Sequence, residues 1–307
     1  MEKTKRNFNI YVIGSIAATL ICVLLRTLCV FLFYDLEIGY YTRGAALPII
    51  FNILIILSVV FFGVGALLLT KDKGIDVQNN SQFVRYLSIV PFGAFLFFVA
   101  NASNKLLAYS SLNAQLDMTF YISLICGLCG AIYFAMTALN KNKAVVGLLF
   151  GFLTIVWFIV SLATSYFDPY VQMNSPDKLI FHMACLSGML FILGEIRCYF
   201  STPRKTLYMF SLSLASLFLF TTSVPSILVT LFGDGLRGYV LLAEDVVCFA
   251  VGLFATAKLI SIAFFEEEEI KEKTEEENET TGDTAQEIET VETAEEKVDE
   301  VEVSDER

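Results

Sequence analysis

The chain has 307 residues, of which 56% are hydrophobic and only 17% are charged, and its formal net charge is −11. A soluble domain of this length carries far more charge and shows amphipathic periodicity, so the composition excludes an ordinary soluble protein. It also excludes a membrane β-barrel, whose strands alternate over about ten residues and give much weaker apolar segments.

Eight apolar runs account for this composition, and each is long enough to cross a bilayer. A helix needs about 20 mostly apolar residues to span the ~30 Å hydrocarbon core. The runs predict an all-α fold, a polytopic bundle of eight transmembrane helices within residues 1–265. In chain order the predicted spans are 10–34, 48–70, 84–107, 119–139, 144–166, 179–200, 206–231 and 239–264.

The net charge divides between two unlike parts of the chain. Residues 266–307 hold 20 acidic and four basic side chains, a net charge of −16, whereas residues 1–265 hold 12 acidic and 17 basic ones, a net charge of +5. The acidic part has no aromatic residue and cannot bury enough apolar surface to offset its ordering entropy. We therefore expect residues 266–307 to be a disordered cytoplasmic tail, which has the charge to recruit a basic cytoplasmic protein.

Basic residues between the spans predict the orientation, because they accumulate on the cytoplasmic side of a membrane. With the N-terminus inside, 12 basic residues of the bundle fall on the cytoplasmic side and five on the outer side. Twelve of the 13 tyrosines fall at span ends or in adjoining loops, where an amphipathic ring favours the headgroup level. Both patterns predict an N-in/C-in protein, and the short loops favour a bacterial plasma membrane.

Ionisable side chains inside spans are costly to insert, so they are the first candidates for function. Arg26 lies in the outer third of the first span on a stripe of small polar residues, and Glu244 lies at similar depth in the eighth. Glu244 shares a helix face with Lys258, which should look into the protein, while Asp245 points about 100° away and reaches water. We expect Arg26 and Glu244 to form an outer pair. The alternative for Arg26 is snorkelling to the outer headgroups.

A second pair is predicted near the cytoplasmic side. Glu195 in the sixth span and Lys258 in the eighth lie at comparable depth, with Arg197 nearby. The alternative is that each charge contacts headgroups or water separately. His182 is the only histidine and lies at the outer rim of the sixth span, where we expect it to be solvated.

The seventh span is rich in hydroxyl side chains and contains Pro225 in its outer third. A proline inside a helix removes a hydrogen bond to the carbonyl four residues earlier, here that of Thr221, and kinks the helix. Such an opening exposes backbone carbonyls to a ligand in discontinuous transporter helices. The alternative is a kink that serves packing alone. The candidate ligand cavity comprises Arg26, Glu244, Thr222, Ser223, Pro225 and Ser226.

Enzymatic function has little support in the sequence. Ser187 and His182 lie in the same predicted helix but on different faces, so the histidine cannot act as the base for that serine. The chain contains no P-loop, HExxH or nucleotide fingerprint, and we expect no metal or cofactor. The basic residues lack the aromatic interleaving of a nucleic-acid surface, which excludes nucleic acid as a partner.

These features favour a permease-like protein that transports a small solute, or a membrane subunit of a transporter. The alternative is a non-transporting membrane sensor or scaffold that recruits a cytoplasmic partner through its acidic tail. An intramembrane enzyme is the least favoured hypothesis. All three place the protein in a lipid bilayer.

Overall fold

The computed structural model describes residues 2–35, 39–69, 82–111, 117–139, 145–168, 172, 174–200, 204–232 and 243–264. Within these ranges, eight helical spans are long and apolar enough to cross a membrane. The prediction of an all-α bundle of eight transmembrane helices is confirmed. The N-in/C-in orientation stays a prediction, and the predicted acidic tail lies outside the described residues.

The spans follow one another with short connections. In chain order the helices are α1 (Glu2–Phe33), α2 (Ala46–Leu69), α3 (Gln82–Leu87), α4 (Ile89–Ser111), α5 (Met118–Ala138), α6 (Val145–Phe167), α7 (Pro176–Phe200), α8 (Lys205–Phe232) and α9 (Ala243–Phe264). α3 and α4 together form a single span that is interrupted at Ser88. Pro91 explains the interruption, because it has no N–H to bond to the carbonyl of Leu87 and its ring crowds that carbonyl.

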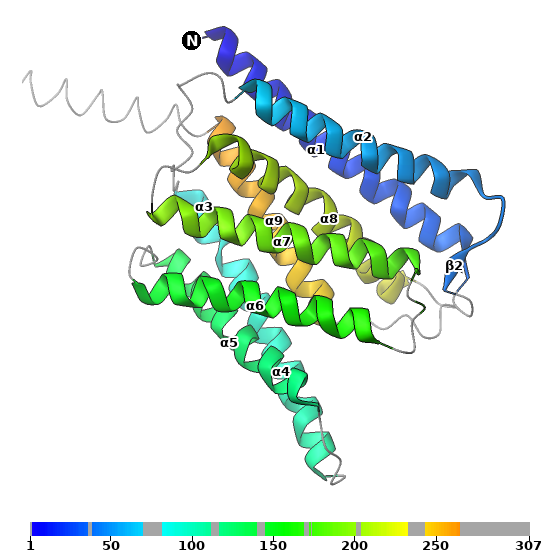
Figure 1. Ribbon diagram of the computed structural model, residues 1–307, viewed down its shortest axis with the longest axis vertical. Coiled ribbons are helices and arrows are strands. Elements are labelled where there is room, and N and C mark those ends of the chain that lie inside the picture. The colour runs from blue at the N-terminus through cyan, green and yellow to red at the C-terminus, as the bar shows by residue number, and fades with distance from the viewer. Residues whose placement is uncertain are drawn as a thin grey trace, which may run out of the picture. The chain divides into compact units, whose positions relative to one another are not determined.

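A short β-hairpin connects α1 to α2. Its strands are β1 (Tyr34–Asp35) and β2 (Tyr40–Tyr41), which pair antiparallel. Gly39 lies in the turn with a φ of 70°, a left-handed conformation that glycine adopts without a Cβ penalty. The hairpin lies at the end of α1 away from the N-terminus (Figure 1), and the hydropathy pattern gave no sign of it.

α8 and α9 are the most buried spans of the bundle. In α9, 72% of the apolar window is buried inside the protein, compared with 22% in α2. α8 packs against α1, α2 and α7, and the spans from α4 to α7 pack on one another in chain order (Figure 1). α9 reaches three helices through aromatic contacts. The ring of Phe254 packs on Phe134 of α5 and Phe191 of α7, and Phe249 packs on Phe220 of α8.

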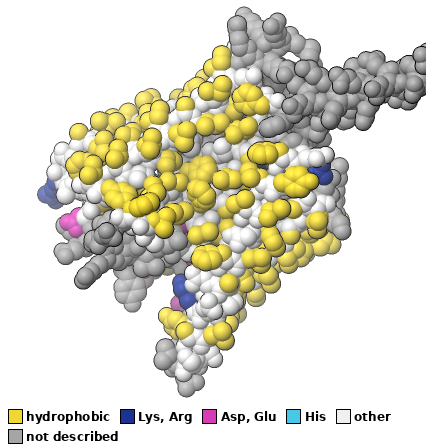
Figure 2. Space-filling view, turned by 180° about the vertical axis from the view of Figure 1, so that it is seen from behind, with side chains coloured by type: hydrophobic (Ala, Val, Ile, Leu, Met, Phe, Trp, Pro, Cys, Tyr) yellow, Lys and Arg dark blue, Asp and Glu magenta, His cyan; other side chains and the backbone are white. Residues whose placement is uncertain are grey.

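The outward faces of the spans are apolar. In α2, for example, Ile49, Ile56 and Leu68 are each more than 60% exposed. Figure 2 shows hydrophobic side chains spread over one face of the protein, with few charged side chains among those described. Such a surface is stable in lipid rather than in water, which fits the membrane environment inferred from hydropathy.

Candidate functional site

Buried polar side chains occur at several depths along α8 and α9. Toward the end of α8, the Ser226 hydroxyl donates to Oδ2 of Asp245 on α9 at 2.5 Å. Farther along, the hydroxyl oxygens of Ser216 and Thr256 lie 2.8 Å apart. A third group surrounds Lys258, which is about 20 Å from Asp245 along the axis of α9 at 1.5 Å per residue. Polar contacts therefore recur over much of the length of these two central helices.

The third group, Glu195 of α7, Tyr208 of α8 and Lys258 of α9, is called the inner cluster here. The Lys258 ammonium lies 2.8 Å from Oε2 of Glu195, and the Tyr208 hydroxyl donates to Oε1 of the same carboxylate. The side chains of Lys258 and Glu195 are only 7% and 1% exposed. Each carboxylate oxygen thus has a donor, which a buried charge requires.

The inner cluster lies toward one end of the bundle, with Tyr208 in the first turn of α8 and the two charged residues farther inside their helices. Lys258 lies more than one helical turn before the end of α9 at Phe264, and Glu195 more than one turn before the end of α7 at Phe200. Ionisable side chains at such depth are expensive, face the protein interior and are associated with substrate or ion pathways. This cluster is therefore the main candidate for a functional site.

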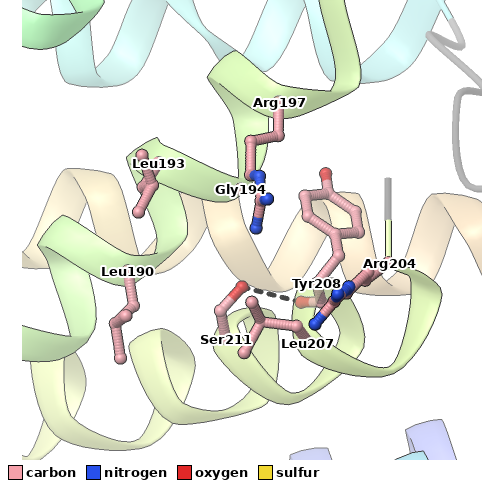
Figure 3. Close-up of a pocket in the computed structure, with 8 residues that line it drawn as sticks. All are labelled: Leu190, Leu193, Gly194, Arg197, Arg204, Leu207, Tyr208 and Ser211. Atoms are coloured by element: carbon pink, nitrogen blue, oxygen red, sulfur yellow. Dashed lines mark hydrogen bonds between the residues drawn. The ribbon is translucent and has the colours of Figure 1, made fainter. Parts of the chain in front are cut away.

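A pocket between α7 and α8 adjoins the inner cluster (Figure 3). Its lining residues are Leu190, Leu193, Gly194, Arg197, Arg204, Leu207, Tyr208 and Ser211. We call it the α7–α8 pocket. Tyr208 belongs to both sites, because it lines the pocket and bonds to Glu195. The free space inside is narrow, on the scale of one water molecule.

No family model, curated protein or solved structure matches the chain. The chemistry of the site is therefore argued from its geometry. In the part of the chain that the structure describes, no three His, Cys, Asp or Glu side chains are grouped as ligands for a metal ion. None of the seven cysteines, all of which the structure describes, forms a disulfide, and all but Cys198 are buried.

The structure places Arg26 inside the protein, where it is 3% exposed. Its guanidinium donates to the Tyr41 hydroxyl in the hairpin and to Oδ1 of Asp177 near the start of α7. Among the described contacts, Arg26 has no bond to Glu244. Burial raises the pKa of Tyr41 well above its ordinary value, against the lowering effect of the Arg26 charge, so this hydroxyl stays protonated at neutral pH.

The carboxylate that contacts Arg26 in the structure is Asp177 of α7, a helix that begins earlier than hydropathy indicates. The helix starts at Pro176 instead of residue 179, which brings Asp177 from the loop into the first turn. The sequence does contain the start signal. Proline favours the first helical position, and the Ser175 hydroxyl accepts a hydrogen bond from the backbone N–H of Lys178 at 3.3 Å.

The two adjacent acidic residues of α9 also differ from expectation. Asp245, predicted to reach water, is 5% exposed and bonded to Ser226, whereas Glu244 is half-buried. The prediction is wrong for Asp245 because α9 is surrounded by protein on most of its circumference. A side chain about 100° from the expected inward face is then still inside the bundle.

Pro225 lies inside α8, which the structure gives as one continuous helix from Lys205 to Phe232. The Thr222 hydroxyl donates to the carbonyl of Phe218 at 2.9 Å, and that of Ser223 to Leu219 at 2.7 Å. Thr222 also reaches the carbonyl of Ile180 on α7 at 3.4 Å. These hydroxyls are therefore used within the protein.

We expected several residues of α8 and α9 to line one outer ligand cavity with Arg26. Among the described contacts, none of these residues bonds to Arg26. Ser226 turns to Asp245 instead, which the sequence interpretation had left facing water. The α7–α8 pocket lies near the opposite end of α8, at Arg204, Tyr208 and Ser211.

Proposed function

We propose that this integral membrane protein is a permease-like transporter of a small solute, with the inner cluster as its charge-bearing site. The observation that carries the proposal is the contact between Lys258 and Glu195, buried within two membrane spans. Replacing a buried ion pair by well-packed apolar residues is often neutral or stabilising. Stability alone is therefore a poor reason to keep two charges at this depth, and transport is the commoner role of such residues.

The contacts along α8 and α9 support a polar pathway. Asp245 with Ser226, and Thr256 with Ser216, place oxygen atoms at two further depths of the same helices. A solute that moves along this line meets hydrogen-bonding partners instead of bare hydrocarbon. Such partners lower the free-energy barrier that a polar group faces in an apolar medium.

The inner cluster offers a mechanism for binding charge. A cationic group of the solute, or a proton, takes the place of the Lys258 ammonium on the Glu195 carboxylate. Tyr208 holds the other carboxylate oxygen during this exchange. Because the α7–α8 pocket is about as narrow as a water molecule, the exchange also requires movement of helices, as alternating access does.

Uptake into proteoliposomes tests the proposal. The purified protein is assayed with a panel of labelled amino acids, sugars, organic acids and organic cations. We expect saturable uptake of at least one of these classes. Glu195→Gln and Lys258→Gln should each reduce that uptake by about tenfold or more, the scale of one charge-assisted contact.

Two exposed residues provide matched controls. Asp117→Asn and Lys105→Gln remove one acidic and one basic charge from exposed positions at the opposite end of the bundle, and both should transport normally. Uptake no greater than that of empty liposomes across the panel contradicts the proposal. So does unchanged uptake by a folded Glu195→Gln variant.

A second candidate function rests on the acidic segment 266–307, whose net charge of −16 suits recruitment of a basic cytoplasmic protein. In that case the bundle is an anchor or sensor in the plasma membrane. Truncation after Glu269 distinguishes the two functions. A transporter keeps its uptake after truncation, whereas a scaffold loses its partner while the bundle remains folded.

A further inference from the structure

We infer that Arg197 and Arg204, which are exposed at the edge of the α7–α8 pocket, bind the phosphate headgroup of an anionic membrane lipid. This inference does not depend on transport, since it concerns the lipid-facing side of α7 and α8. It assigns a ligand to side chains that the transport proposal leaves unused.

Two arginines supply the charge. Arg197 lies near the end of α7 and Arg204 directly precedes α8, and both line the same pocket. Figure 3 shows the Arg197 side chain extending from α7 toward the pocket, with the Arg204 side chain near Leu207 and Tyr208. Within the described residues, neither guanidinium has a carboxylate partner. Guanidinium groups bind phosphate through paired N–H donors, which makes two unpaired arginines in one pocket a suitable phosphate site.

The wall of the pocket distinguishes a lipid from a free anion. Leu190, Leu193 and Leu207 line it and are 40%, 38% and 43% exposed. They belong to the apolar surface that the spans present to the bilayer. An acyl chain attached to the bound phosphate can lie against these leucines, whereas inorganic phosphate gains nothing from them.

The Glu195 carboxylate next to the pocket is already paired inside the protein. Gly194 allows α7 and α8 to approach closely, since a Cβ atom there would lie 2.9 Å from Cδ2 of Tyr208. The Tyr208 ring therefore closes the floor, and its hydroxyl bonds to the Glu195 carboxylate. The other carboxylate oxygen is neutralised by Lys258. Arg197 and Arg204 are thus the charged side chains that line the pocket.

The location also suits an anionic lipid. The pocket lies at the same end of the bundle as the start of α1 (Figure 1), which the basic residues predict to be cytoplasmic. The cytoplasmic leaflet is rich in anionic lipids, and each arginine or lysine near its surface contributes favourably to binding.

Native mass spectrometry of the full-length protein tests the inference. Binding of phosphatidylglycerol is compared with that of phosphatidylcholine carrying the same acyl chains. We expect the wild type to prefer phosphatidylglycerol by about thirtyfold, the scale expected for two basic residues near the membrane surface. Inorganic phosphate at millimolar concentration should displace little of this lipid, because it lacks the acyl chains.

The double variant Arg197→Gln/Arg204→Gln should lose the preference. Both side chains are exposed, so the substitutions should leave the fold intact. The matched control is Arg43→Gln/Lys105→Gln, which removes two exposed basic residues from the opposite end of the bundle. This control should keep the full preference.

Four outcomes overturn the inference. These are a wild type without preference, a preference that survives in Arg197→Gln/Arg204→Gln, a preference lost equally in the control, and displacement of the lipid by inorganic phosphate. Hydrogen exchange on the wild type gives an answer even if the double variant fails to fold. Phosphatidylglycerol should then slow exchange around 197–208 relative to phosphatidylcholine, and protection elsewhere or none at all contradicts the site.

Discussion

The Nζ atom of Lys258 on α9 lies 2.8 Å from Oε2 of Glu195 on α7, although the two residues are 63 positions apart in the chain. Tyr208 of the intervening helix α8 bonds to the other carboxylate oxygen. One carboxylate therefore connects three spans. Since all three side chains are nearly fully buried, a change to either charge leaves its partner without a counterion in a medium of low dielectric constant.

Removal of one charge from this pair should destabilise the bundle strongly. We expect Lys258→Met to lower the free energy of unfolding by about 3–5 kcal/mol, because the Glu195 carboxylate is left buried and unpaired. Glu195→Gln should lower the free energy of unfolding by a similar amount, because the buried Lys258 ammonium then loses its contact with the carboxylate. The double variant should be much less destabilised than the sum of the two single variants. Denaturant unfolding in detergent micelles measures all three.

The control for this cycle is Asp117→Asn, which should change stability by no more than about 0.5 kcal/mol. Asp117 is exposed and its side chain makes no capping bond to α5. Additive effects of the two single substitutions would show that the contact contributes little. A stable double variant that no longer transports would separate the functional role of the pair from its structural role.

Arg26 connects α1, the hairpin and α7 through Tyr41 and Asp177. We expect Arg26→Gln to lower the free energy of unfolding by about 1–3 kcal/mol, since it leaves polar partners of a buried charge unsatisfied. Asp177 is 21% exposed, so water compensates part of this loss. Thermal unfolding in detergent measures the effect.

Arg43→Gln is the matched control for Arg26→Gln. Arg43 follows the same hairpin but is exposed, and its loss should be nearly neutral. Arg26→Gln combined with Asp177→Asn should be less destabilising than the sum of the single substitutions. Equal stability of the Arg26 and Arg43 variants would contradict the role assigned to Arg26.

The fold could be predicted from the sequence because a bilayer leaves few alternatives. Every backbone polar group must be satisfied within the hydrocarbon core, so each apolar run of sufficient length becomes a helix. Hydropathy also gives depth along the membrane normal. Glu195 and Lys258 share a depth, which is why their proximity could be inferred before the helices were arranged in space.

Hydropathy does not say which helices are neighbours, and this limits prediction of the site. Arg26 and Glu244 share a depth too, but α7 supplies Asp177 to Arg26 instead. Tyr208 lies near the start of a predicted span, where the sequence indicates an interfacial ring, and its bond to Glu195 depends on how α7 packs on α8. Arg204 and Arg197 share a pocket for the same reason. Such contacts depend on how the helices pack against one another, and this packing cannot be predicted from the composition of the spans.

Close packing of α1 on α2 provides a test of the helix arrangement. A Cβ atom at Gly65 would lie 2.4 Å from Cδ2 of Tyr11. This ring is held in place, because its hydroxyl bonds to Ser213 of α8 at 2.9 Å. We expect Gly65→Ala to destabilise the protein by about 1–3 kcal/mol through overpacking.

The matched control is Gly93→Ala in α4. An added Cβ atom there meets nothing within 4 Å, and alanine favours a helix over glycine by up to about 1 kcal/mol. This variant should be neutral or more stable in the same thermal unfolding assay. Equal destabilisation by both substitutions would contradict the packing of α1, α2 and α8 described here.

The orientation of the bundle is tested by labelling single cysteines in intact cells, in a variant without the seven native cysteines. The end of the bundle that carries the N-terminus holds 12 basic residues and the other end five, which predicts that the N-terminal end is cytoplasmic. An impermeant thiol reagent should therefore modify Gln172→Cys but not Asn142→Cys or Thr290→Cys. Permeabilised cells should label all three positions, which controls for reactivity. Labelling of Thr290→Cys in intact cells would invert the orientation, and the α7–α8 pocket would then face the leaflet that is poorer in anionic lipid.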